Sequence, residues 1–400
     1  MKNKNNRNNS INYIQFELKE ILGTFVNGGF SSAGYALYPL VRGVSSSLAK
    51  RLMTLVYFVK SKNKTYGLDF SNSLDKFRDF SGNVSNAKNF AMVLSELYED
   101  FDKNKCVINA KAVNVKPNCL KEKDYKDDYL KPVLELKKFS EDNLKDYLID
   151  IHVHGSLATL DYVEGWSDFD TLAIIRKDAI ADSSKLLKLR DILYKSRKYF
   201  YKIDPLQHHG HLIFTEHDFD YYCQTFFPIA LFKYSKSLFS SKIFEFKLRD
   251  CDDENIKKFK WFVDYFKNTA SNGSNRMNSY DLKFFLHAVT LFPAMYLQAK
   301  GLHMYKKFSF NIAKKDFGEE EWNAIDYVSL LRKNWESPKN FSLILPYAEI
   351  NPLLAYQLNS KLLNIISNTT KQNRIDIKKI ANGMRILANS AEKKISAKYG

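Results

Sequence analysis

Two short polar clusters contain the residues of this sequence that are best suited to chemistry. Gly155-Ser156 follow the apolar run 148–153, and Asp168 and Asp170 precede the apolar run 171–175. Residues two apart on a strand point the same way, so the two aspartates should share one face. Such close carboxylates repel each other, and a hard cation usually neutralises them. A glycine–serine turn offers N–H groups and a hydroxyl to phosphate oxygens. The pattern therefore predicts metal beside phosphate.

The elements around these clusters must hold them together in space. The spacing predicts a strand over 148–153, a tight glycine turn, a short helix, and a second strand that begins with the two aspartates. The alternative is that these residues are solvated turn positions and a helix cap. Apolar strands directly before the glycine and after the second aspartate favour the functional interpretation.

This arrangement resembles the signature of the DNA polymerase beta-like nucleotidyltransferase superfamily. The resemblance covers residues 140–217 and rests on Gly155, Ser156 and Asp168-Phe169-Asp170, although Thr171 is less apolar than usual. It implies a small mixed α/β sheet and transfer of a nucleotidyl group from an NTP, such as ATP, to a hydroxyl. It also implies that Asp168 and Asp170 bind a divalent metal, Mg²⁺ or Mn²⁺, and that Gly155 and Ser156 hold the triphosphate.

A third acid from a neighbouring strand usually completes such a site, and the sequence departs from that pattern. The next strand candidate, 208–215, contains no carboxylate. By alternation, Leu212 and Phe214 should face the covering helices, which places His209 and His211 on the opposite, active-site face.

Three residues are therefore candidates for the missing third function: His209, His211 and Asp204. A histidine could act as a general base or as a ligand of manganese. The alternative is that the histidines cap strand ends. Zinc is not expected, because neighbouring residues point to opposite faces and no zinc-ligand spacing occurs.

The composition predicts a globular cytoplasmic protein. The chain has 400 residues, including 30 Phe and 24 Tyr, enough for a sizeable core. Its four cysteines show no paired spacing, which favours a reducing compartment. The polar segment 1–10 does not resemble a signal peptide, and the most apolar window, 37–59, is too interrupted by charges to span a membrane.

The charge balance is basic, with 61 Lys and Arg against 45 Asp and Glu, hence a formal net charge of +16. Part of the excess lies in residues 371–400, away from the motif. A basic field attracts polyanions non-specifically, but no nucleic-acid-reading module is recognisable. Nucleic acid is thus a possible acceptor but not the favoured one.

The predicted fold class is α+β, a small nucleotidyltransferase sheet flanked by helical regions. The predicted boundaries are a disordered tail at 1–12, a mostly helical region at 13–139, the catalytic module at 140–220 and a helical domain at 221–400. Helices are expected in the C-terminal half, at 279–300 with a bend at Pro293 and a stop at Gly301, and at 318–335, 346–368 and 374–397.

These observations predict a metal-dependent nucleotidyltransferase that acts on an unidentified small-molecule or macromolecular hydroxyl. The alternative is a catalytically inactive module of the same fold that binds nucleotide or a partner, having lost the third acid. Lys306 and Lys307, after the expected helix 279–300, could reach a triphosphate, although paired lysines are usually just exposed.

Overall fold

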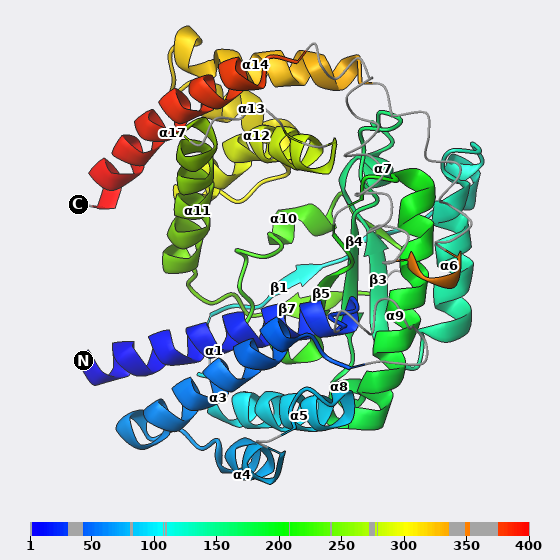
Figure 1. Cartoon of the computed structure of the whole chain (residues 1–400), viewed down its shortest axis with the longest axis vertical. Coiled ribbons are helices and arrows are strands. Elements are labelled where there is room, and N and C mark those ends of the chain that lie inside the picture. Colours follow the sequence, from blue (N-terminus) through cyan, green and yellow to red (C-terminus); the bar gives the residue numbers. More distant parts are fainter. Residues whose placement is uncertain are drawn as a thin grey trace.

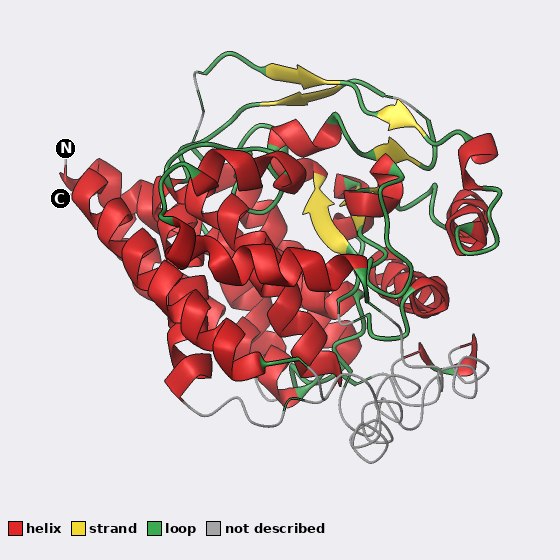
Figure 2. Cartoon of the chain, turned by 90° about the horizontal axis from the view of Figure 1, so that it is seen from above, coloured by secondary structure: helices red, strands yellow, loops and turns green. Residues whose placement is uncertain are grey.

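The computed structural model shows a chain in which helices predominate and strands are few and short (Figure 2). It describes residues 2–30, 43–80, 83–106, 108, 110–207, 209–240, 242–271, 277, 279–335, 349–352 and 375–399. The fold is thus of mixed α and β type, as predicted. In Figure 1 the N-terminal and C-terminal helices gather at opposite ends of the view.

The larger sheet has five strands in the order β2-β6-β3-β4-β5. Its centre is β3 (Leu148–Val153), which runs antiparallel to β4 (Thr171–Ile175), while β4 runs parallel to β5 (Leu212–Thr215). The apolar runs predict both β3 and β4, but β4 begins at Thr171, after the two aspartates that were expected at its start. The other strands are β2 (Asn118–Cys119) and β6 (Lys236–Ser237) in this sheet, and β1 (Val113–Val115) paired with β7 (Phe244–Phe246) in a separate ribbon.

The two faces of β4 belong to different packing layers. Ala173 and Ile175 join the large core that the N-terminal helices share, whereas Leu172 and Ile174 join a smaller aromatic cluster on the other face. All four side chains are buried. A strand covered on both faces explains the continuous apolar run at 171–175.

The alternation predicted for β5 is reversed. Ile213 packs into the helical core, and His211 just before it lies on the same side, bonded to Ser196 of a helix. Leu212 lines a cavity on the opposite face, and Phe214 belongs to the aromatic cluster there. Alternation fixed which residues share a face, but not which face the helices cover.

A layer of N-terminal helices covers one face of the sheet (Figure 1). Its first member, α1 (Lys2–Val26), includes the segment 2–12 that was predicted to be disordered. That prediction is wrong because Ile11 is fully buried in the core, as is Ile14 one turn later. The other helices of this layer are α3 (Ser46–Tyr66), α4 (Ser71–Phe80), α5 (Ala87–Asn104), α6 (Lys131–Asn143), α8 (Lys177–Ala181) and α9 (Ser183–Ile203).

The packing of the structure does not follow the predicted domain boundaries near residues 140 and 221. Leu22, Leu94 and Ile151 belong to one hydrophobic core, so no packing boundary falls near residue 140. Strands β6 and β7 return the chain to the sheet region after residue 221. The C-terminal helical unit therefore begins near α11 (Asp252–Ser271).

The C-terminal helices share a core of their own. The central helix, α12 (Ser279–Ala299), contains Pro293, and Gly301 follows it with a φ of 82°. The remaining members are α13 (Lys306–Lys314), α14 (Glu319–Lys333) and α17 (Ile377–Tyr399). Most of the predicted helix 346–368 lies outside the described residues. Within the described part of the chain, no helix is both long and apolar enough to cross a membrane.

Four short connecting elements remain among the described residues. The short helix predicted after the glycine is α7 (Gly155–Thr159). A four-residue helix, α10 (Ile229–Phe232), follows β5 and two 3-10 turns flank the sheet, η1 (Glu122–Tyr125) and η2 (Glu216–Asp218).

Candidate active site

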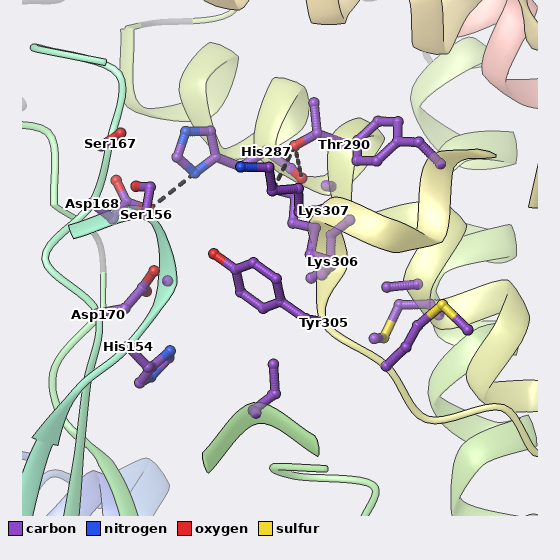
Figure 3. A pocket seen from close by; sticks show the side chains of 18 of the residues that line it. His154, Ser156, Ser167, Asp168, Asp170, His287, Thr290, Tyr305, Lys306 and Lys307 are labelled. Atoms are coloured by element: carbon purple, nitrogen blue, oxygen red, sulfur yellow. Dashed lines mark hydrogen bonds and ion pairs between the residues drawn. The ribbon is translucent and has the colours of Figure 1, made fainter. Parts of the chain in front are cut away.

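A cavity of about 780 Å³ lies between the sheet and the C-terminal helices. This volume is within the range usual for small-molecule sites. The predicted motif residues Gly155, Ser156, Asp168 and Asp170 all line it, as does His209. Figure 3 shows the motif side chains on one wall and side chains of the C-terminal helices across from them.

Gly155 has no room for a side chain. It follows β3 with a φ of 68°, in the left-handed region that favours glycine. A Cβ atom here would overlap the Oδ2 atom of Asp170. The backbone of the turn therefore lies directly against the Asp170 carboxylate. Ser156, the next residue, lines the cavity wall.

Asp168 is a buried carboxylate held by two side chains of α12, a lysine and a histidine. Its Oδ1 lies 3.1 Å from Lys283 Nζ, and its Oδ2 lies 2.9 Å from His287 Nδ1. Burial alone would raise the pKa of Asp168, but His287 and Lys283 hold it well below the usual value. Asp168 is thus an anion whose charge is already compensated.

His209 lies between the two aspartates. Its Nε2 atom is 3.5 Å from Asp168 Oδ2 and 3.3 Å from Asp170 Oδ1. Burial lowers the pKa of His209, but the hydrogen bonds to both carboxylates outweigh it and raise the pKa to about 10. The imidazole is therefore a cation at neutral pH, and it contributes to the lowered pKa of Asp170.

Gln207 contacts both the segment that carries the two aspartates and the His209 side chain. Its Oε1 accepts a hydrogen bond from the N–H of Phe169 at 3.0 Å, and Phe169 separates the two aspartates in sequence. Its Nε2 lies 3.1 Å from His209 Nδ1. Gln207 is fully buried, and so is its contact with Phe169, whereas its contact with His209 is only partly buried.

His211, predicted as a candidate for the third function, lies away from the cavity. Its ring is 2.8 Å from Thr171 Oγ1 and 2.7 Å from Ser196 Oγ, and it packs edge-on against Phe200. Burial lowers the pKa of His211 to about 3, so the ring is neutral. It joins β4 to α9 and does not contact the aspartates.

Asp204, the second candidate, is also outside the cavity lining. It caps the end of α9, where its Oδ1 accepts the N–H of Leu206, and its Oδ2 is 2.6 Å from Lys283 Nζ. Burial raises the pKa of Asp204 to about 8, with Lys283 opposing the shift. Its position makes it a partner of Lys283 beneath the site.

Two functional residues, Lys283 and His287, were not found by sequence reasoning. Both come from α12, more than a hundred residues after Asp168. They are four apart, hence on one face of the helix, within an otherwise apolar stripe. A lysine–histidine pair at this spacing on a buried helix is the signal that could have identified them.

Cations also line the wall opposite the motif. Lys306 donates to Thr290 Oγ1 at 2.8 Å, and burial lowers its pKa to about 8, with Arg332 adding to the shift. Lys307 pairs with Asp161 Oδ2 at 2.9 Å. Figure 3 shows Tyr305, Lys306 and Lys307 across the cavity from the aspartates.

Comparison with known proteins leaves the site to be interpreted from its geometry. No family model, curated protein or solved structure matches the chain. Across the described residues, no group of three His, Cys, Asp or Glu side chains is arranged to hold a metal ion. The observations that bear on function are therefore the aspartate pair, the glycine–serine turn and the cations around them.

Proposed function

We propose that this protein is a metal-dependent nucleotidyltransferase that transfers NMP from an NTP to a hydroxyl group. The observation that carries the proposal is that the Gly155–Ser156 turn meets Asp168 and Asp170 on one wall of a cavity, and that Lys306 and Lys307 lie across from them. Nucleotidyl transfer depends mainly on positioning and on neutralising the phosphate oxygens, and these groups suit both tasks.

The phosphate-binding role falls to groups on both walls. Ser156 offers a hydroxyl at the turn. The absence of a side chain at Gly155 lets the backbone of this turn lie against the Asp170 carboxylate. Lys306 has a partly buried ammonium group that is bonded only to a neutral threonine among the described residues. A buried cation gains most from an anionic ligand, so Lys306 is the favoured partner of the triphosphate.

Asp168 and Asp170 are the residues that would hold the metal. Mg²⁺ is usually bound by one or two carboxylates together with substrate phosphates, so two carboxylates fit such an ion. A bound divalent ion would neutralise charge on the attacking and leaving oxygens. In the structure these carboxylates contact His209, Lys283 and His287, with which a bound metal ion would compete.

A second candidate function has its own supporting observation. The acids that line the cavity are Asp161, Asp168 and Asp170, and Asp161 is paired with Lys307. The third carboxylate of the described lining, Asp161, is thus already in an ion pair. A module that binds NTP without turnover would have this composition.

Substitution of Asp170 tests the proposal most cleanly. Asp170 is about one-third exposed, so Asp170→Asn should leave the fold intact, whereas Asp168→Asn breaks a buried ion pair and should also lower stability. Loss of a direct metal ligand is expected to weaken Mn²⁺-dependent ATP binding at least about 100-fold. Binding is measured by calorimetry, and transfer by release of labelled pyrophosphate.

The exposed residue Asp178 gives the matched control. Asp178→Asn removes the same charge on α8, away from the cavity, and should leave binding unchanged. Full metal-dependent ATP binding in Asp170→Asn would overturn the proposal. Binding without pyrophosphate release across a panel of hydroxyl acceptors would favour the non-catalytic module.

A further inference from the structure

The cavity extends far beyond the aspartates along α12. Residues of one face of this helix line it at intervals of three or four, from His287 through Leu291 and Met295 to Gln298. Eleven residues of helix at 1.5 Å each span roughly 16 Å. The end of the cavity near Gln298 is therefore separate from the end where His287 contacts Asp168.

The walls of this extension are apolar. We call it the aromatic lobe and define it by Phe226, Trp261, Phe262, Leu291 and Met295, all of which line the cavity. Trp261 is half exposed and stacks on Tyr265, with the ring planes 4° apart. Flat apolar surfaces of this kind bind aromatic or aliphatic groups.

One charged side chain, Lys258 of α11, also lines this part of the cavity. Its Nζ donates to the carbonyl of Thr225 at 2.8 Å, and Gln298 Nε2 donates to the same carbonyl at 3.1 Å. No carboxylate of the described chain lies within ion-pair distance of Lys258, in contrast to Lys283 and Lys307. Burial lowers the pKa of Lys258 to about 8.

Charge and shape at this end therefore select one kind of ligand. An ammonium group at the same end of the cavity as these aromatic side chains, hydrogen-bonded among the described residues only to a carbonyl, gains from an incoming anion. The apolar walls gain from covering a hydrophobic body. A free phosphate satisfies the first requirement only, and a neutral hydrocarbon satisfies the second only.

We propose that the aromatic lobe binds an amphipathic anion, an aromatic compound with a carboxylate, sulfonate or phosphate group that pairs with Lys258. We assign this compound as the hydroxyl acceptor, and that assignment rests on the proposed nucleotidyltransferase function, whereas the binding of the compound does not. The nucleotide phosphates and this anion would occupy opposite ends of the cavity, so both can be present together.

Two fluorescent probes with the same aromatic body test the role of Lys258. 1-Anilinonaphthalene-8-sulfonate carries an anionic group, and N-phenyl-1-naphthylamine lacks it. Replacing one partner of a charge-assisted hydrogen bond costs about 1.5–3 kcal/mol, so Lys258→Met should weaken sulfonate binding at least about tenfold. Binding of the neutral probe should change less than about twofold.

Matched variants complete this experiment. Lys257→Met alters the adjacent exposed lysine of α11 and should leave both affinities unchanged. Ala294→Phe, which fills part of the cavity and leaves Lys258 in the sequence, should exclude both probes. Near-ultraviolet circular dichroism verifies the fold of each variant. Equal sulfonate affinity in the wild type and Lys258→Met would overturn the proposal, as would parallel loss of both probes in that variant.

Calorimetry with Mn²⁺ and ATP separates this inference from the proposed function. If the wild type binds no nucleotide but its sulfonate binding depends on Lys258, the aromatic-lobe proposal is supported and the nucleotidyltransferase proposal fails. If nucleotide binds and the substitution of Lys258 leaves sulfonate binding unchanged, the aromatic-lobe proposal fails and the nucleotidyltransferase proposal does not. The expected result is that Lys258→Met loses the sulfonate and retains ATP.

Discussion

At the scale of single residues, Gly155 is fixed by two independent demands. Its φ of 68° disfavours any side chain, and a Cβ would overlap Asp170. We expect Gly155→Ala to cost about 1 kcal/mol in stability through the backbone and to displace the Asp170 carboxylate. Metal-dependent ATP affinity should then fall at least about tenfold, which calorimetry measures.

Gly67 separates these two effects. It has a similar φ of 62° at the end of α3, but no atom lies within 4 Å of the position of its Cβ. Gly67→Ala should therefore lower the melting temperature and leave ATP affinity intact. If Gly155→Ala lost no more affinity than Gly67→Ala, the overlap with Asp170 would have no functional meaning.

At the scale of elements, α1 positions the loop that carries His209. Asn27, just beyond the last residue of α1, donates to the carbonyl of His211 and accepts its N–H, both at 2.8 Å. A Cβ at Gly210 would overlap the amide oxygen of Asn27, so the loop lies directly against this side chain. The N-terminal helix thus supports the active-site wall from behind.

Asn27→Ala should leave both backbone groups of His211 without these partners. The expected cost is about 1–3 kcal/mol in the free energy of unfolding, measured with urea, together with weaker ATP binding because His209 loses its support. The control is Thr24→Ala, which removes an exposed hydroxyl bonded within α1. Unchanged stability in Asn27→Ala would contradict the positioning role.

At the scale of the whole molecule, Asp102 of α5 connects distant parts of the chain. Its carboxylate lies 3.0 Å from Lys177 Nζ and 3.3 Å from His217 Nδ1, and it also pairs with Lys105. Burial opposes ionisation, but the hydrogen bonds to His217, Lys105 and Lys177 lower the pKa of Asp102 below its usual 3.8. The free energy of unfolding therefore includes a contribution from this anion.

The lowered pKa fixes the direction of the pH dependence. The contribution is fully present above the unfolded pKa and is lost as the pH falls through the folded pKa. The wild type should exceed Asp102→Asn in stability most at neutral pH, and the gap should shrink as the pH falls below about 4. Urea unfolding over this range measures the gap, with the exposed Asp75→Asn as control. A gap that stays constant with pH would refute this account.

The sequence predicted the local parts of the site and missed the remote ones. Strands β3 and β4 and the placement of Asp168 and Asp170 on one wall followed from short-range periodicity. The face taken by His211 did not follow, because a strand buried on both sides carries no polar face to mark its orientation. The burial of Asp204 could not be predicted either, because its ion-pair partner Lys283 is distant in sequence.

By itself, the sequence determined the turn at Gly155 and the pairing of two carboxylates, because both depend on backbone geometry over a few residues. Tertiary structure decided which side chains meet those carboxylates, and it placed His287 and Lys283 there from a helix more than a hundred residues later in the sequence. It also created the aromatic lobe, since a cavity exists only where separate elements fail to fill the space between them. The local sequence supplies the reactive residue types, whereas long-range packing brings them together into one site.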